Sequence, residues 1–231
     1  MKSKIYDLFR GTPIASVATE VYARTLPIHG TVAEYELGED SIEIVCQDEQ
    51  PSQLRESIIF GEKNMLENLI QQVTSNDVVW DVGAHLGIYS AFLCRHAETV
   101  VSFEPNRARR AILRGNLRRN GLKPLIEPHF LGDGSGPSVE ADSLELPEPT
   151  VMKMDIEGGE LDALHGMTQL LKREDFRLIF IEIHPSEADI NNGLTEDEYD
   201  EIKHILHESR FSVKDIEDRD GQPFLRGKKT Q

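Results

Sequence analysis

The stretch that most constrains this chain runs from Asp77 to Glu104. It is predicted to form an apolar strand over 78–82, a glycine turn over 83–87, a helix over 88–96 and a second strand over 100–103. Glycines in the first turn let a ligand approach the backbone, because a Cβ would clash there. A carboxylate roughly 20 residues further on is where nucleotide-binding α/β folds hold ribose hydroxyls. The stretch therefore predicts a nucleoside-containing ligand held by Gly83, Gly87 and Glu104.

The spacing of the turn argues against a dinucleotide. The turn reads D-V-G-A-H-L-G over 81–87, and the middle glycine of the G-x-G-x-x-G fingerprint, which admits a pyrophosphate, is replaced by His85. A carboxylate at Asp81 would repel a pyrophosphate and suits a cationic ligand. An NAD-type oxidoreductase is the alternative, and binding of NADH would support it.

Composition restricts the partners. The 231 residues are enough for one well-buried α/β domain with an appendage. Forty-one acidic residues against 25 basic ones give a net charge of −16, so we expect no nucleic acid and no membrane as partner. Such a surface is found in proteins of a high-salt cytoplasm and equally in acidic mesophilic proteins. Cys46 and Cys94 lie in apolar segments and are predicted to be buried free thiols.

No targeting or membrane segment is evident in the sequence. The N-terminus carries charges throughout and has no apolar core of signal-peptide length. No stretch approaches the roughly 20 apolar residues of a membrane span. We expect a soluble, cytoplasmic protein.

The segment before the glycine turn is predicted to be accessory. We divide the chain into 1–60, an N-terminal arm and β-hairpin, and 61–231, the ligand-binding domain. Alternating residues over 31–37 and 41–46 predict the hairpin, and helical spacing predicts a helix over about 62–73. The first 30 residues are interpreted as an arm packed on the domain, with a lid over the substrate as the alternative.

The segment after Glu104 is predicted to hold a helix, a strand and a loop. They cover about 107–120, 124–131 with a break at Pro128, and 132–137. Four arginines, Arg107, Arg110, Arg114 and Arg118, share one face of this helix. We expect a solvated outer face, and a site for a phosphate-bearing substrate or RNA is the alternative.

Two further apolar runs, 151–154 and 177–183, are typical of central parallel strands buried on both faces. A helix over 160–172 separates them, a helix over 196–209 follows, and 211–216 with 224–227 predict a closing hairpin. Ligands bind beyond the carboxyl ends of parallel strands. Six residues are therefore expected around one crevice: Gly83, Glu104, Asp155, Glu157, Glu182 and His184.

Four segments together resemble the FkbM family of methyltransferases, across roughly residues 60 to 190. They are DVGAHLGIYS at 81–90, FEP at 103–105, KMDIEGGE at 153–160 with Leu164 and Gly166, and EIHP at 182–185. The resemblance implies the class I methyltransferase fold, which is α/β with a Rossmann-like doubly wound, mostly parallel sheet and a terminal antiparallel hairpin. It also implies S-adenosylmethionine as methyl donor and O-methylation of a hydroxyl on a sugar or other small metabolite.

The resemblance also implies site residues. Asp81, Gly83 and Gly87 would form the loop beside the methionine part of the cofactor, with His85 where asparagine is common. Glu104 would take the ribose. Independently of the resemblance, Asp133 in the turn-rich loop is a candidate for the adenine amino group, and a purely turn-forming role is the favoured interpretation. The chain departs from the family between Gly132-Asp133 and 141–144, where members usually carry a longer segment with extra strands.

Three residues are the candidates for catalysis. Methyl transfer from a sulfonium is an in-line displacement, and a hydroxyl nucleophile benefits from a base within hydrogen-bond reach. The candidate bases are Asp155, Glu157 and His184, with Asp155 first because it ends a buried strand. The alternatives are that Asp155 caps the next helix, that Glu157 makes a surface pair, and that His184 is a substrate donor or a core histidine.

Two alternatives concern the whole site. Asp155, Glu157, Glu182 and His184 could gather a divalent cation, as in the metal-dependent catechol-type methyltransferases. The spacing of a dedicated metal loop is missing, so the sequence assigns no metal ligand. The protein could also be a cofactor-binding module of the same fold without turnover. We expect a small-molecule acceptor and catalytic methyl transfer.

Overall fold

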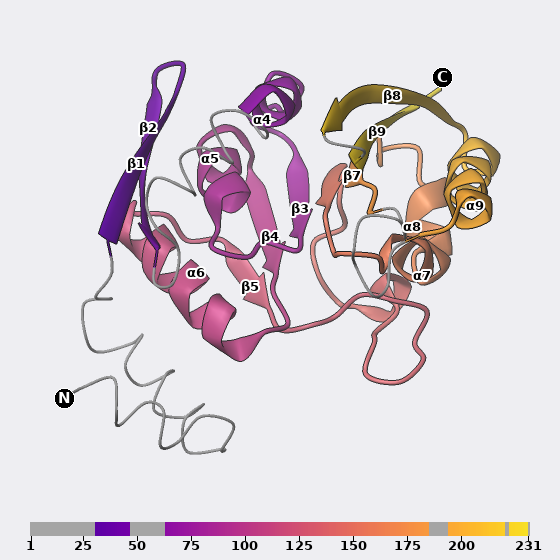
Figure 1. Cartoon of the computed structure of the whole chain (residues 1–231), viewed down its shortest axis with the longest axis horizontal. Helices are drawn as coiled ribbons and strands as arrows, with labels where there is room; N and C mark the ends of the chain where they lie inside the picture. The colour runs from indigo at the N-terminus through magenta and orange to yellow at the C-terminus, as the bar shows by residue number, and fades with distance from the viewer. Residues whose placement is uncertain (1–30, 47–62, 185–193, 220–221, 231) are drawn as a thin grey trace.

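The computed structural model describes residues 31–46, 63–184, 194–219 and 222–230 (Figure 1). The predicted arm over 1–30 lies outside the described residues. The β-elements are β1 (Thr31–Leu37), β2 (Asp40–Cys46), β3 (Val78–Val82), β4 (Thr99–Phe103), β5 (Leu125–Glu127), β6 (Val151–Met154), β7 (Leu178–Glu182), β8 (Phe211–Arg219) and β9 (Gln222–Lys229). The helices are α4 (Lys63–Ile70), α5 (Ile88–His96), α6 (Arg107–Arg119), the 3₁₀ turn η2 (Ala141–Ser143), α7 (Glu160–His165), α8 (Thr168–Lys172) and α9 (Glu196–Glu208).

The main sheet has the strand order β5-β4-β3-β6-β7-β9-β8. Its first five strands are parallel, and β9 joins β7 antiparallel before pairing with β8. The order reverses between β3 and β6, which is the switch point at which open α/β sheets form their ligand crevice. This architecture confirms the predicted class I methyltransferase fold with its terminal hairpin.

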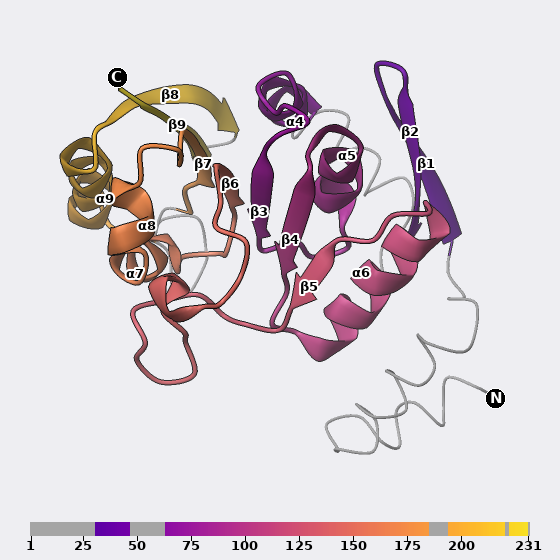
Figure 2. The same ribbon diagram turned by 180° about the vertical axis from the view of Figure 1, so that it is seen from behind.

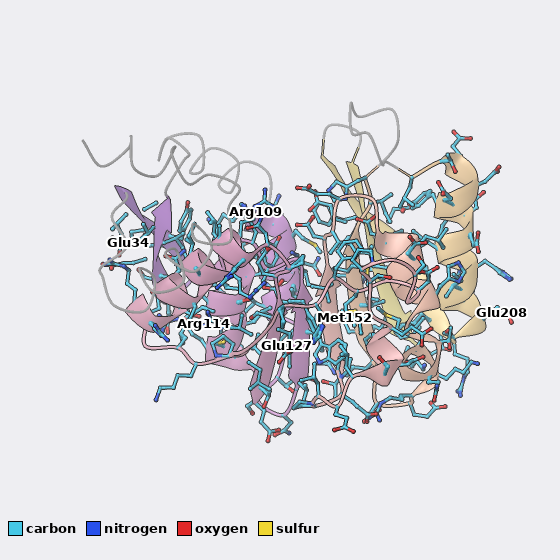
Figure 3. All side chains as sticks on the ribbon, turned by 90° about the horizontal axis from the view of Figure 1, so that it is seen from below. Glu34, Arg109, Arg114, Glu127, Met152 and Glu208 are labelled. Carbon is cyan, nitrogen blue, oxygen red and sulfur yellow. The ribbon has the colours of Figure 1, made fainter. Side chains whose placement is uncertain are left out.

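Helices cover both faces of the sheet because both faces are apolar. Successive strand residues point to opposite faces, so Val79 joins one buried cluster and Trp80 the other. The first cluster packs under α4, α5, α6 and the β1–β2 hairpin, and the second under α7, α8 and α9 (Figures 1 and 2). Met152, on the central strand β6, lies in the middle of the molecule (Figure 3).

Two asparagines fasten the N-terminal hairpin to the sheet layer. Asn116 of α6 is fully buried; its side chain accepts the Val45 N–H at 2.9 Å and donates to the Leu86 carbonyl at 2.9 Å. Asn120 bonds the backbone N–H and C=O of Glu43 in the same way. The two asparagine side chains thereby provide hydrogen-bond partners for backbone groups along the free edge of β2. The predicted hairpin is confirmed, and it shares its apolar core with α5 and α6.

Three predicted elements differ from the structure. The strand predicted over 124–131 is only Leu125–Glu127, because the prolines on either side, Pro124 and Pro128, have no N–H to donate. The helix predicted over 160–172 is divided into α7 and α8 at Gly166, where a Cβ would lie 1.9 Å from the Gly132 carbonyl oxygen. The closing hairpin is longer than predicted. A bulge between Asp215 and Glu217 adds a residue to β8 and so interrupts the alternation of side chains by which a strand is recognised in the sequence.

Two other sequence-based expectations concern Cys94 and membrane spans. Cys94 is a free, half-buried thiol, and burial with the charge of Asp81 raises its pKa to about 12. The side chain of Cys46 lies outside the described residues. None of the helices in the described ranges has the length and apolar character that crossing a bilayer requires.

The buried carboxylate of Asp77, just before β3, links the start of β3 to the starts of β6 and β7. Asp77 accepts from the Arg177 guanidinium at 2.5 and 3.1 Å, from the Thr150 hydroxyl at 2.6 Å and from the Thr74 N–H at 2.7 Å. Burial acts to raise the pKa of Asp77, but these partners outweigh it and hold that pKa below its usual value.

We expect Asp77→Asn to lower the free energy of unfolding at pH 7 by about 2 kcal/mol, the usual contribution of hydrogen bonds to a charged group. Because the folded state depresses this pKa, the contribution is complete above the ordinary pKa of about 3.9 and is lost as the pH falls through the folded value. Urea unfolding from pH 7 to pH 3 measures it, with the exposed Asp197→Asn as control. An equal deficit at both pH values would contradict the prediction.

Candidate active site

The carboxyl ends of β3, β4, β6 and β7 open into one cavity of about 620 Å³. All six residues expected around the crevice line it: Gly83, Glu104, Asp155, Glu157, Glu182 and His184. A volume of this size is in the range of small-molecule and cofactor sites. The strand ends and the turns that follow them therefore position the candidate side chains together.

The loop after β3 passes so close to β6 that it requires glycine. Gly83 has a φ of 82°, and a Cβ on it would lie 1.8 Å from the Asp155 carbonyl oxygen. Gly87 has a φ of 90° at the start of α5, and its Cβ would meet Leu113 Cδ1 at 2.4 Å. Gly83 thus keeps the loop against the base of the cavity, and Gly87 lets α6 pack against the turn.

Glu104 closes the first side of the cavity. It is 4% exposed, and its two oxygens accept the backbone N–H groups of His85 at 3.0 Å and Asn106 at 2.8 Å. Burial raises its pKa, although those N–H groups and the charges of Arg109 and Arg110 act against the shift. The carboxylate is held at the end of β4 with its oxygens on the glycine-turn side, where hydroxyl donors of a ligand would reach it.

Asp81 lies beneath the loop and does not line the cavity. It is fully buried, its Oδ2 accepts the Ser90 hydroxyl at 2.5 Å, and its Oδ1 lies 3.5 Å from Lys153 Nζ. Lys153 in turn donates to the Gly83 carbonyl at 3.3 Å and to Asp155 Oδ2 at 3.3 Å. Lys153 and Asp155 are two residues apart and therefore lie on the same side of the strand, where they pair. Asp81 therefore supports the loop through Lys153.

Asp155 and Glu157 follow β6 on the floor of the cavity. Asp155 is half-buried, and its Oδ1 lies 3.6 Å from His184 Nε2. Glu157 is exposed, lines the same cavity and has a φ of 55°, a conformation that non-glycine residues seldom adopt. Two carboxylates and an imidazole thus face one space at the end of two neighbouring strands.

His184 is fixed by a residue that the sequence interpretation did not assign. It is 5% exposed, and its Nδ1 lies 3.0 Å from Oε1 of Glu160, which is fully buried at the start of α7. Burial acts to lower the pKa of His184, but the hydrogen bond and charge of Glu160, with the charges of Asp155 and Glu182, raise it above its usual value. The Nε2 is left facing Asp155 and Glu182.

The structure separates some predicted site residues from the cavity and adds others. Gly87, Asp81 and Asp133 are not among the lining residues. Asp133 is exposed and accepts the Ser135 N–H, so this placement does not support its predicted adenine contact. The residues just before the short link that follows Gly132, His129, Phe130 and Leu131, also line the cavity, together with Arg109 (Figure 3) from the first turn of α6.

Two comparisons with known proteins find similarity to methyltransferases. Residues 137–213, which contain the segments around Asp155 and His184, match the model of the Methyltransferase FkbM domain. The hexuronic acid methyltransferase AglP of Haloferax volcanii is 30% identical over 153 residues. Over these residues the chain is similar to FkbM methyltransferases. The match with AglP covers 54% of this chain and 63% of AglP, so the chain spans less than two thirds of the length of that protein.

Solved structures agree on the fold. The FkbM methyltransferase of Methylobacillus flagellatus superposes with a TM-score of 0.53 at 19% identity, over 79% of this chain and 55% of that one. TYW2 of M. jannaschii, solved in complex with AdoMet, gives a TM-score of 0.53 at 14% identity over 87% and 88%. At such low identity these similarities concern the architecture alone, which is the class I methyltransferase fold.

Proposed function

We propose that this protein is an S-adenosylmethionine-dependent methyltransferase acting on an oxygen of a small acceptor, as predicted from the sequence. The observation that carries the proposal is the meeting of Gly83, Glu104 and Asp155 in one cavity at the strand switch point. A cofactor seated there would have its ribose hydroxyls donate to Glu104 and its methionine part lie along the loop at 83–87.

The proposed chemistry is an in-line displacement. The acceptor oxygen forms a bond to the methyl carbon, the carbon–sulfur bond breaks, and the sulfonium becomes a neutral thioether. A hydroxyl acceptor loses its proton to a carboxylate or imidazole of the cavity, for which Asp155, Glu157 and His184 are the proposed candidates. Lys153 holds Asp155 Oδ2 at 3.3 Å and so fixes the carboxylate for this role.

We propose a sugar acid as the acceptor class, since AglP is named for hexuronic acid. Arg109 and His129 line the cavity and are basic groups that a sugar carboxylate could approach. We do not propose nucleic acid as the acceptor, because a protein with a net charge of −16 repels its phosphates. A cytoplasmic location remains a prediction from the sequence.

The test is incubation with methyl-labelled S-adenosylmethionine and either glucuronic acid, a neutral hexose or transfer RNA, at low and at molar KCl. We expect label in the uronic acid, and alkaline treatment distinguishes a methyl ester from an ether. Labelled RNA without labelled sugar would overturn the acceptor class. Cofactor binding without transfer to any acceptor of the panel would favour the alternative, a binding module without turnover.

A further inference from the structure

A buried histidine and two carboxylates meet at the end of β7, on the side of the cavity away from Glu104. Asp155, Glu182 and His184 each offer one ligand atom, and these three atoms lie within 4.8 Å of one another. His184 Nε2 is 3.6 Å from Asp155 Oδ1 and 4.0 Å from Glu182 Oε1. Donors about 2.1 Å from one octahedrally coordinated metal ion lie roughly 3 Å apart when adjacent and roughly 4.2 Å apart when opposite. Both separations fall between these limits.

The orientation of His184 independently indicates a ligand. Its ring is 5% exposed and is fixed through Nδ1 by Glu160, which also accepts the Gly158 N–H at 3.2 Å. None of the hydrogen bonds found among the described residues uses Nε2, which faces the cluster and lines the cavity. A carboxylate that orients a histidine through one nitrogen while the other nitrogen takes the metal is a recurring arrangement in metal sites.

Local charge favours a cation in the same place. Three carboxylates lie within 4.0 Å of the His184 ring: Asp155, Glu160 and Glu182. The imidazole carries at most one positive charge, and Lys153 Nζ, 3.3 Å from Asp155, is shared with the buried Asp81 at 3.5 Å, whereas buried carboxylates require pairing or a metal to offset their desolvation. A divalent ion would supply the balance and leave Glu160 as the hydrogen-bond partner of the histidine.

We infer that Asp155, Glu182 and His184 form a binding site for one divalent metal ion with open coordination positions, of the Mn²⁺ type that accepts both carboxylate and imidazole ligands. The inference rests on the proposed function for its role: the ion would take the acceptor oxygen as a further ligand and make its hydroxyl more acidic. The proton would then leave to Glu157, the exposed carboxylate of the same cavity, while Asp155 serves as ligand.

The test uses Mn²⁺ alone, without cofactor or acceptor. The full chain is freed of metal by chelation and titrated with Mn²⁺ in moderate KCl, and electron paramagnetic resonance measures the free ion. We expect one tight site in the wild type, weakened more than roughly 100-fold in Glu182→Gln and His184→Gln, and roughly 10–100-fold in Glu160→Gln. The control, Asp197→Asn, removes an exposed carboxylate from the acidic first turn of α9 and should change nothing.

Two further readouts keep the outcome decisive. Pulsed resonance on the wild type with bound Mn²⁺ should detect the nitrogen of the histidine ligand, and it does not depend on any variant folding. Binding of S-adenosylhomocysteine to the metal-free protein tests the cofactor site separately. Cofactor binding without a tight Mn²⁺ site, or a Mn²⁺ signal without nitrogen coupling, would overturn the metal site and leave the proposed function standing.

Discussion

Gly83→Ala is expected to lower the affinity for S-adenosylhomocysteine by more than roughly 100-fold. The new Cβ would lie 1.8 Å from the Asp155 carbonyl oxygen, which belongs to the backbone that follows β6 and cannot rotate away. Either the loop or the Asp155 segment must shift away from the cofactor, and a loss of about 2.8 kcal/mol in binding free energy corresponds to a 100-fold loss of affinity. Isothermal titration calorimetry measures the affinity, and thermal unfolding measures the loss of stability of the variant relative to the wild type.

Gly121→Ala is the matched control for this change. Gly121 has a φ of 71° after α6, close to the 82° of Gly83, but a Cβ there would meet no atom within 4 Å. Both variants bear the left-handed backbone strain of about 1–2 kcal/mol, and only Gly83→Ala adds the clash. We expect Gly121→Ala to lose stability and keep its affinity. Similar affinities in the two variants would mean that the loop at 83–87 does not hold the cofactor.

Asp155→Asn is expected to lower the rate of methyl transfer by roughly 10²–10⁴-fold, the range for losing a group that promotes removal of the acceptor proton, whether as the base or as a ligand of the inferred ion. The amide keeps the shape of the carboxylate but can neither accept a proton effectively nor balance Lys153 Nζ at 3.3 Å. Because the cofactor is assigned to Gly83 and Glu104, affinity for S-adenosylhomocysteine should change little. Single-turnover rates with labelled S-adenosylmethionine and the best acceptor measure the effect.

Asp197→Asn makes the same chemical change on an exposed face of α9 and should leave the rate unaltered. Full activity in Asp155→Asn would contradict the assignment of Asp155. An equal loss of rate and of cofactor affinity would instead mean that Asp155 shapes the cofactor site.

The sequence was sufficient for the fold and for most of the strand-end residues, because both depend on local patterns. Apolar runs such as 151–154 and 178–182 specify buried parallel strands, and a parallel sheet brings its carboxyl ends to one edge. Gly83, Glu104, Asp155 and His184 follow from that rule alone. The chemical roles of these residues remain predictions.

Contacts between distant elements could not be predicted in this way. Glu160 resembles an ordinary acidic residue of a first helical turn, and its bond to His184, 24 residues later, depends on how α7 packs beside β7. Asp81 was predicted to face the ligand, yet it is paired beneath the loop, because its strand position points toward Ser90 of α5. Gly166 marks the close approach to Gly132 that divides α7 from α8, and only the folded chain reveals it.

The most direct measurement is a calorimetric titration of the folded protein with S-adenosylhomocysteine, at low and at molar KCl, for the wild type, Glu104→Ala and the exposed control Glu98→Ala. We predict one micromolar site in the wild type and in Glu98→Ala. In Glu104→Ala the affinity should fall by roughly 100-fold or more, since hydrogen bonds to a charged group contribute about 1.5–3 kcal/mol each. No binding to the folded wild type at either salt concentration, or undiminished binding to Glu104→Ala, would contradict the assignment of this cavity to S-adenosylmethionine.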